Sequence, residues 1–286
     1  MSSSKSIAVS PFTMPAALAA ADVVLNRSDW KGVPGNPQQQ TWLARFRHRA
    51  TEASTMAEIQ SHATTLAPEH GKWLARQGWE AQITQGQPGD LFLAAVLNIV
   101  AKWKEAGKAY EEDGVHRAVV KRGCYLFEGK GPHPMIEVLT RHPSYRFCFQ
   151  QVKRAPTSLA ELAEQSLEMA VHPTWDGGDV HLDFPMVDML ARNEAPYMIG
   201  LHAGSNVVVQ ASEQLRLELN EIGGRASAAA EVAVSRGISL KPRVIKIDGP
   251  FLVAVRRANA SAGVENIVFA AYCDRDVWGR PAKDRI

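Results

Sequence analysis

The sequence predicts a mixed α+β fold with a large mixed β-sheet, further sheets and a reduced set of helices. Apolar residues run almost without interruption from Leu91 to Trp103, which is typical of a strand buried on both faces and placed mid-sheet. Leu215, Leu217 and Leu219 alternate with polar residues, as expected of a strand with one buried face. Few helical stretches interrupt these and other strand-like segments, and this favours the α+β class.

Composition narrows the choice of protein class. The chain has 286 residues, of which 45% are hydrophobic and 22% charged, as in globular proteins and unlike disordered ones. This length fits one large domain or two small ones, and we expect a single domain over residues 1–286. The chain has 32 basic and 30 acidic residues, so its net charge of +2 favours neither nucleic acid nor anionic lipid as a partner. No apolar run reaches the ~18 residues of a membrane helix, so we expect a soluble protein.

The N-terminal segment is similar to a secretory signal, because the apolar stretch Ile7–Leu18 follows a lysine and precedes a run of alanines. Pro11 and Pro15 interrupt that stretch, and Thr13 is placed to cap a helix that reaches Leu25. We therefore expect a retained strand followed by a helix, and a cytoplasmic protein, with secretion as the alternative.

The middle of the chain divides into helical and strand-like stretches. Two helices are predicted around Trp42–Phe46 and Glu69–Gln77, and the glycine after the second is placed to end it. A third helix, at Leu159–Met169, follows a capping box of Ser158 and Glu161. Further strands are predicted at Ala118–Phe127, Tyr145–Val152, Val180–Phe184, Val244–Arg256 and Val264–Tyr272.

The connection between the last predicted strands, about residues 221–243, is much longer than the usual 4–6 residues. It contains a run of alanines that helix propensity alone would place in a helix. Connections of this length are usually functional or disordered, so we expect a long exposed loop near the C-terminus.

Several segments, in this order, resemble the serpin family. Ser10–Leu18 resembles the early serpin strand and helix, and Leu91–Lys104 resembles the central strand that ends in a tryptophan. Leu215–Gly224 and the alanines after it resemble the strand that leads into the serpin reactive-centre loop, where a glutamate and a glycine precede alanines. Gly249–Arg256 resembles the closing Pro-Phe-Leu strand. The resemblance spans nearly the whole chain, and the loop and Pro-Phe segments are its specific parts.

The resemblance implies an inhibitor of serine or cysteine proteases. In the family mechanism a protease cleaves the exposed loop, and the freed segment enters the large sheet as an extra strand. Arg236–Gly237 is the implied bait bond, because arginine suits a trypsin-like pocket with a buried carboxylate, although counting from the hinge places the bait on Gly237 itself. The implied hinge is made of an acid and small residues: Glu221, Gly223, Gly224, Ala226, Ala228, Ala229 and Ala230. We expect a trypsin-like or cysteine protease as partner, and neither a cofactor nor a metal.

The chain departs from the family pattern at several positions. Family members are usually longer, and the segment Trp79–Ile83, which resembles an edge strand, leads to the central strand without the helix that usually covers the front of the sheet. Ala95 and Glu213 stand where the family has the asparagine and histidine of a hydrogen-bonded shutter beneath the sheet. Gly224 and Arg225 replace a small hydroxyl residue and an acid. These departures keep open a non-inhibitory scaffold that binds a partner or small molecule, or that has acquired an enzymatic pocket.

Other clusters of polar residues are interpreted as structural. His172, Asp176, Asp179, His181 and Asp183 carry metal-type donors. Their spacing matches no ligand pattern, so we interpret the group as a solvated strand face. The basic residues of the last third are Lys241, Arg243, Lys246, Arg256 and Arg257, and with a net charge near zero they are interpreted as a solvated face and not as a polyanion site.

The spacing of the cysteines and the absence of common site motifs exclude several kinds of disulfide, metal and catalytic site. Cys124, Cys148 and Cys273 are too far apart for a disulfide framework or a zinc knuckle, so three free thiols are expected. The sequence has no G-x-S-x-G, Walker or G-x-G-x-x-G motif, which removes the best-marked hydrolase, nucleotide and dinucleotide sites.

Overall fold

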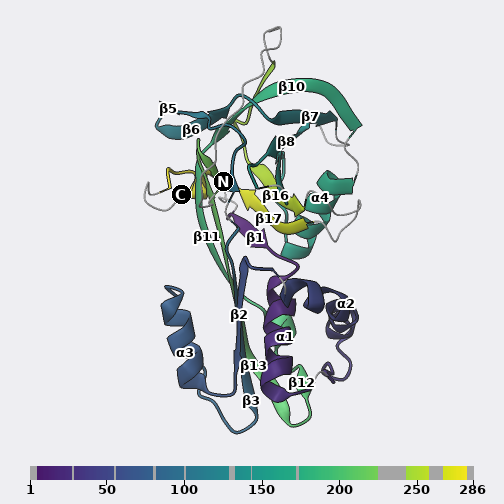
Figure 1. The fold of residues 1–286 in the computed structure, drawn as a ribbon. Coiled ribbons are helices and arrows are strands. Elements are labelled where there is room, and N and C mark those ends of the chain that lie inside the picture. The colour runs from purple at the N-terminus through teal and green to yellow at the C-terminus, as the bar shows by residue number, and fades with distance from the viewer. Residues whose placement is uncertain are drawn as a thin grey trace. The chain divides into compact units, whose positions relative to one another are not determined.

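The computed structural model describes residues 5–27, 29–54, 56–79, 82–99, 101–128, 133–142, 144–171, 174–224, 243–257 and 267–281. The chain divides into two compact units (Figure 1). The first unit comprises Met1–Ser10, Ile99–Leu190 and Arg216–Ile286, and the second comprises Pro11–Asn98 and Ala191–Leu215.

The first unit is built on a ten-stranded sheet. In spatial order its strands are β1 (Ile7–Val9), β17 (Ile267–Cys273), β16 (Phe251–Arg257), β9 (Tyr145–Gln151), β8 (Met135–Leu139), β7 (Cys124–Glu128), β10 (Thr174–Pro185), β6 (Val115–Val120) and β5 (Lys108–Glu112). These neighbours are antiparallel, whereas β15 (Arg243–Lys246) adds to β10 in parallel. The predicted mixed sheet is therefore present.

Helix α4 (Leu159–Val171) packs beside β1, β16 and β17. It begins where the sequence predicts, and the backbone N–H of Glu161 donates to the Ser158 hydroxyl at 3.1 Å. This bond is only half of the predicted capping box, because the Glu161 carboxylate accepts from the N–H and hydroxyl of Thr157 instead of the Ser158 N–H. On the sheet, a cluster of fully buried aromatic rings surrounds Trp103, which meets Phe147 edge-on with ring centres 5.3 Å apart.

A seven-stranded sheet runs through the second unit. Its strands are β2 (Ile59–Thr64), β3 (Asp90–Leu97), β13 (Asn206–Leu219), β14 (Gly223–Gly224) and β4 (Ala101–Lys102), with β11 (Val187–Glu194) and β12 (His202–Ala203) also paired to β13. β3 lies between β2 and β13, so the apolar central strand is mid-sheet as predicted. By residue number, β14, β4 and the end of β13 belong to the first unit.

Helices cover this sheet in the second unit: α1 (Thr13–Leu25), α2 (Pro37–Ser54) and α3 (Ala67–Arg76), with the 3₁₀ turn η1 (Pro196–Met198), while η3 (Arg275–Val277) belongs to the first unit. Leu18 of α1 packs with Leu93 and Ala95 of β3 in one apolar cluster. Leu74 of α3 packs with Ala94, whose side chain leaves the opposite face of the same strand. β3 is thus buried on both faces, which explains its continuous apolar run.

Several predicted strands are divided in the structure. The Leu91–Trp103 strand ends at Leu97, where the N–H of Asn98 turns to the carbonyl of Glu58, and β4 resumes at Ala101. Gly123, with φ of +70°, separates β6 from β7 within the single strand predicted there.

The strand predicted at Val244–Arg256 is likewise two strands, β15 and β16, with Pro250 just before the second, because proline has no N–H for a ladder. Trp79, Gln82 and Ile83 lie outside any strand, and β2, which the sequence did not indicate, borders β3 instead.

Thr13 does not cap α1 as predicted. The N-cap residue is Phe12, and the Thr13 hydroxyl instead donates to Glu213. The strand-then-helix order of this segment is confirmed, since β1 pairs with β17 and the buried face of α1 follows.

The three cysteines are free and buried, as expected. Burial, with Glu137 nearby, raises the pKa of the Cys148 thiol to about 12, and burial raises that of Cys273 as well.

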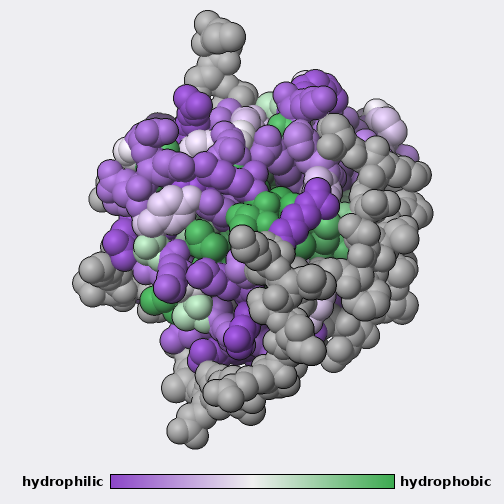
Figure 2. Space-filling view, turned by 90° about the horizontal axis from the view of Figure 1, so that it is seen from above, coloured by the Kyte–Doolittle hydropathy of each residue, from purple (hydrophilic) through white to green (hydrophobic). Residues whose placement is uncertain are grey.

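Figure 2 shows a mostly hydrophilic face with a smaller hydrophobic patch near its centre. Within the described ranges, no helix combines the length and hydrophobicity of a membrane-spanning segment.

Candidate functional site

The predicted loop begins with a tight turn at the end of β13. The Asn220 side-chain oxygen accepts from the N–H groups of Ile222 at 2.8 Å and Gly223 at 3.1 Å. The Asn220 N–H donates in turn to the Gly223 carbonyl at 3.0 Å. These bonds reverse the chain, so that β14 runs antiparallel to β13.

Strand β14 lies between two other strands. Gly224 pairs with Leu219 of β13 on one side and with Ala101 of β4 on the other, and Gly223 pairs with Lys102. The first two residues after the turn are therefore already part of the sheet. Arg225 and the next residues, through residue 242, lie outside the described residues, and so do the predicted bait Arg236–Gly237 and the hinge alanines Ala226, Ala228, Ala229 and Ala230.

Both glycines of β14 are required by space. A Cβ on Gly223 would lie 2.3 Å from the carbonyl oxygen of Ala101, and one on Gly224 would lie 2.9 Å from the Phe147 ring. Sequence reasoning assigned these glycines to hinge freedom, whereas the structure shows that the backbone of β4 requires the first and the Phe147 ring the second.

Trp103 and Glu221 hold the turn from its two sides. The Trp103 indole donates to the Asn220 carbonyl at 2.8 Å, and its backbone N–H donates to Ile222 at 3.0 Å. Glu221 accepts from Arg280 at 3.2 Å, and its other carboxylate oxygen is buried with no hydrogen-bond partner. The predicted hinge acid is therefore fastened to the C-terminal segment.

The other end of the loop is anchored by β15, which follows residue 242. β15 pairs in parallel with β10 from Val180–Arg243 to Asp183–Lys246, and the N–H of Ile247 then donates to the Asp183 carbonyl at 2.8 Å. Lys246 forms an ion pair with Glu112 at 2.8 Å.

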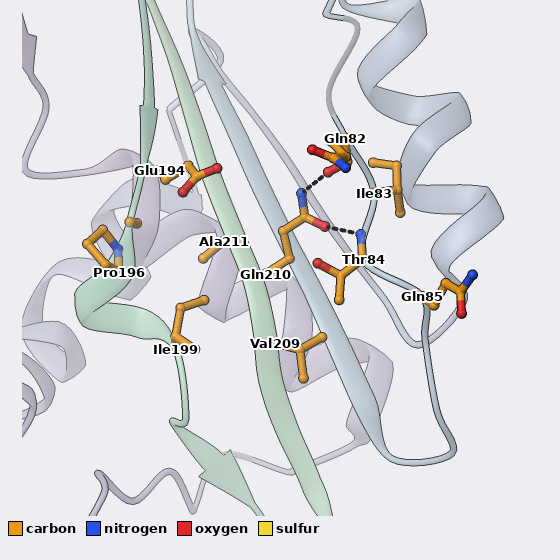
Figure 3. Close-up of a pocket in the computed structure, with 11 residues that line it drawn as sticks. Gln82, Ile83, Thr84, Gln85, Glu194, Pro196, Ile199, Val209, Gln210 and Ala211 are labelled. Carbon is orange, nitrogen blue, oxygen red and sulfur yellow. Dashed lines mark hydrogen bonds between the residues drawn. The ribbon is translucent and has the colours of Figure 1, made fainter.

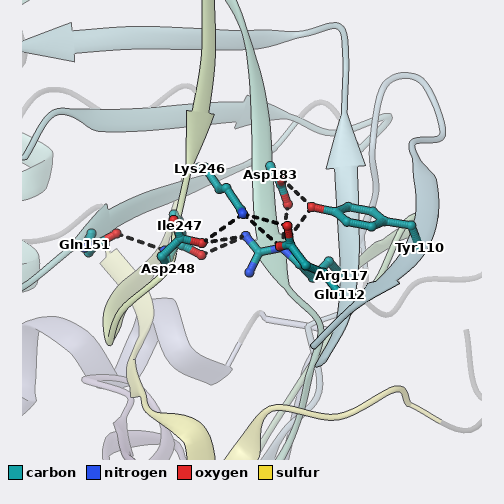
Figure 4. A network of polar contacts seen from close by, with 8 residues as sticks. All are labelled: Tyr110, Glu112, Arg117, Gln151, Asp183, Lys246, Ile247 and Asp248. Atoms are coloured by element: carbon teal, nitrogen blue, oxygen red, sulfur yellow. Dashed lines mark hydrogen bonds and ion pairs between the residues drawn. The ribbon is translucent and has the colours of Figure 1, made fainter. Parts of the chain in front are cut away.

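A buried polar network lies beneath this anchor (Figure 4). Arg117 donates to Asp183 at 2.9 Å and to the Ile247 carbonyl at 2.9 Å. The Tyr110 hydroxyl donates to the second Asp183 oxygen at 2.6 Å. Burial disfavours the charge on Arg117, but Asp183 and Tyr110 more than offset it, so the pKa of Arg117 is raised.

For Asp183, this network corrects the interpretation of the group as a solvated strand face, whereas His172 and the side chains of Asp176 and Asp179 lie outside the described part of the chain. Asp183 is 6% exposed and ion-paired, and its neighbours Leu182 and Phe184 are fully buried, so β10 is buried on both faces here. No group of three or more metal-ligating side chains occurs among the described residues. Two of the five basic residues interpreted above as a solvated face form ion pairs: Lys246 with Glu112, and Arg256 with Glu137.

Glu213, which stands at the position of the family's shutter histidine, forms a different polar cluster in the second unit. Its side chain accepts from the Thr13 hydroxyl and from the Asn193 amide at 3.2 Å, and it lies opposite Ala95 in the register of β13 with β3. Burial raises the pKa of the Glu213 carboxyl, and the two hydrogen bonds oppose that shift only in part. Its partners Thr13 and Asn193 are 200 and 20 positions away in the chain, so no local pattern predicts them.

Comparisons with known proteins extend these observations. No family model matches the sequence, and no curated protein matches it. Among solved structures, Serpin48 of the insect Tenebrio molitor, described as a highly specific serpin, is similar over 98% of this chain and 93% of its own, with 13% identity and a TM-score of 0.55.

Human thyroxine-binding globulin in complex with its hormone is similar over 95% of this chain and 92% of its own, with 12% identity and a TM-score of 0.56. Another thyroxine-binding globulin complex gives 13% identity over 95% of this chain and 93% of its own, with a TM-score of 0.52. At these identities the likeness concerns the fold, and the chain has a divergent, serpin-like α+β fold.

Proposed function

We propose that this chain is a serpin-type protease inhibitor, whose loop of about residues 221–243 is cut at Arg236–Gly237 by a trypsin-like or cysteine protease. The observation that carries the proposal is the position of β14 between β13 and β4. Two loop residues there already occupy the place that an entering strand would extend.

The register of β14 indicates where an entering strand would go. Carried forward from the Leu219–Gly224 pair, it sets Ala226 opposite Leu217 and Ala228 opposite Leu215. Directly opposed residues of antiparallel strands share a face, and both leucines are buried. Alanine at these positions suits a buried face that has little free space.

Strand pairing supplies the driving force. β3 and β13 are parallel and pair directly from Asp90–Val207 to Leu97–Leu215. A strand entering from β14 runs antiparallel to both, so it replaces one parallel pairing with two antiparallel ones, and antiparallel pairing is slightly more stable per residue. Cleavage is needed because β15 holds the far end of the loop.

Incubation with a trypsin-like protease tests the proposal. We expect a denaturant-resistant covalent complex, loss of protease activity and a cut at Arg236–Gly237 located by mass spectrometry. The variant Arg236→Glu should form no complex with the same protease. Plain cleavage of the loop, with the protease left fully active, would exclude the inhibitory function.

A non-inhibitory scaffold that binds a small molecule or partner is the second candidate, and Glu213 favours it. The same register sets Ala230 opposite Glu213, so full entry would bring a new strand against a buried carboxyl group. If that contact stops entry, the loop would be cut without inhibition, as in the negative outcome above.

A further inference from the structure

A hollow in the second unit opens where β13 carries a bulge on one edge and, among the described residues, has no hydrogen-bonded neighbour on the other. On one edge the register with β3 shifts at Val209, which is bulged out of the ladder. On the other edge, the N–H of Ala195 donates to Ala211, and contact with β13 resumes only where Gly200 donates to Val208. The 3₁₀ turn η1 crosses the interval between these two bonds, so the chain arches away from the strand there.

The hollow has a volume of about 560 Å³, within the 300–1,000 Å³ range of small-molecule sites. Figure 3 shows that Pro196 and Ile199 lie on one side of β13, while Gln82 and Thr84 lie on the other. Glu194, the last residue of β11, lies on the same side of β13 as Pro196 and Ile199.

One wall of this pocket is fixed by a single side chain. The Gln210 amide donates to the Gln82 carbonyl at 3.1 Å, and its oxygen accepts from the Thr84 N–H at 3.2 Å. Both ends of the amide are used, so the segment before β3 is held against β13. A wall held in this way lowers the ordering cost of binding a ligand.

The lining combines apolar surface with one charge. Ile83, Ile199 and Val209 provide aliphatic surface, and Thr84 provides a hydroxyl. Among the described residues that line the pocket, Glu194 is the only charged one, and no basic side chain lines it. A ligand with a positive end and a compact apolar body matches this lining, whereas an anion would face Glu194 without a cationic partner.

We propose that this pocket binds a small organic cation, a primary amine with a compact apolar group. The ammonium group contacts the Glu194 carboxylate, and the apolar group contacts Ile199 and Val209. None of the residues that line this pocket belongs to the turn at Asn220–Gly224, and the proposal does not depend on the fate of the loop.

The probes are 2-phenylethylamine, its neutral analogue 2-phenylethanol and the anion phenylacetate, titrated into the whole protein at pH 7 and followed by protein-observed NMR. The amine should bind roughly fivefold more tightly than the alcohol, the upper end expected for one exposed ion pair, and phenylacetate more weakly still. Shifts should map to Thr84, Ile199 and Val209.

Two variants and a control locate the site. Glu194→Gln should lower the affinity for the amine to that for the alcohol, and Ile199→Trp should block both ligands, since residue 199 is 41% exposed and tolerates a larger side chain. Glu58→Gln, a change of the same kind elsewhere in the second unit, should leave binding unchanged. No detectable binding of the amine, equal affinity for amine and phenylacetate, or amine binding that survives both pocket variants would overturn the proposal.

Discussion

The two ends of the loop are anchored in opposite ways. At the N-terminal end, β14 consists of two glycines, which have no side chains of their own and are held by backbone pairing with the neighbouring strands and by the Asn220 side chain at the turn. At the C-terminal end, β15 is fastened by charged side chains that centre on the buried Arg117–Asp183 pair. A strand held by backbone pairing can lengthen residue by residue, whereas a network of ion pairs resists sliding. Under the proposed function, this difference predicts that the N-terminal end of the loop moves after cleavage while the C-terminal end stays.

The largest effect is expected from cutting the loop. If the N-terminal part then enters the sheet, the cleaved protein should melt at a markedly higher temperature than the intact one. Ala228→Arg should abolish the increase, because the register places residue 228 opposite the buried Leu215 and an unpaired buried charge costs several kcal/mol.

Calorimetry on intact and cleaved forms measures this, with Ala228→Ser as the control that should retain most of the increase. Equal melting temperatures of the cleaved and intact parent protein would show that the loop does not enter the sheet. The difference between the two anchors would then not be related to movement of the loop.

The second effect concerns the C-terminal anchor. Asp183→Asn removes the buried carboxylate from Arg117, which keeps only longer ion pairs to the exposed Asp248 at 3.6 Å and Glu112 at 3.7 Å. Loss of one member of a buried pair costs about 3–5 kcal/mol, and these remaining ion pairs set the expected cost at or below the lower end of that range. We expect a lower free energy of unfolding in urea and faster hydrogen exchange at Ile247, whose N–H bonds to residue 183.

The double variant Arg117→Met with Asp183→Asn should recover part of the loss, because no buried charge then remains unpaired. Slow hydrogen exchange at the Ile247 amide in the single variant would mean that the backbone pairing of β15 with β10, and not the Arg117–Asp183 ion pair, holds β15.

Sequence reasoning reached the N-terminal anchor better than the C-terminal one. The alternation of Leu215, Leu217 and Leu219 is local and indicated the strand that leads into the turn, although Gly223 and Gly224 were interpreted as a hinge and not as a strand. Arg117 and Asp183 are 66 positions apart, and Thr13 and Glu213 are 200 apart, so only the strand register brings each pair together. The division of β6 from β7 was missed for a local reason, because the predicted strand Ala118–Phe127 passed over Lys121, Arg122 and Gly123, which separate the two apolar stretches.

A smaller effect is expected at the N-terminal anchor. Gly223→Ala should displace β14, because its Cβ would lie 2.3 Å from the Ala101 carbonyl, which belongs to rigid backbone. We expect a cost of about 1–3 kcal/mol and loss of exchange protection at the Trp103 amide, which donates to the Ile222 carbonyl at 3.0 Å. Gly279→Ala is the control, since nothing lies within 4 Å of that added atom, and it should change neither quantity. Unchanged protection in Gly223→Ala would contradict the close fit of β14.

The smallest expected effect tests whether β14 lengthens by one residue at a time. Glu218 is buried; one of its carboxylate oxygens pairs with Arg216, and the other has no hydrogen-bond partner. The Leu219–Gly224 register, carried one residue forward, sets Arg225 opposite Glu218, where a guanidinium would supply the missing donor. This gives a physical reason for a basic residue at the position where the serpin pattern has an acid.

Arg225→Glu should therefore slow loop entry after cleavage, by roughly fivefold for a cross-strand pair worth about 1 kcal/mol. The rate can be followed by the fluorescence of Trp103, whose indole bonds to the turn at Asn220. Arg225→Lys keeps the charge and should stay near the parent rate. If the Glu and Lys variants enter equally fast, the free oxygen of Glu218 does not meet residue 225, and the first step of entry depends on backbone pairing alone.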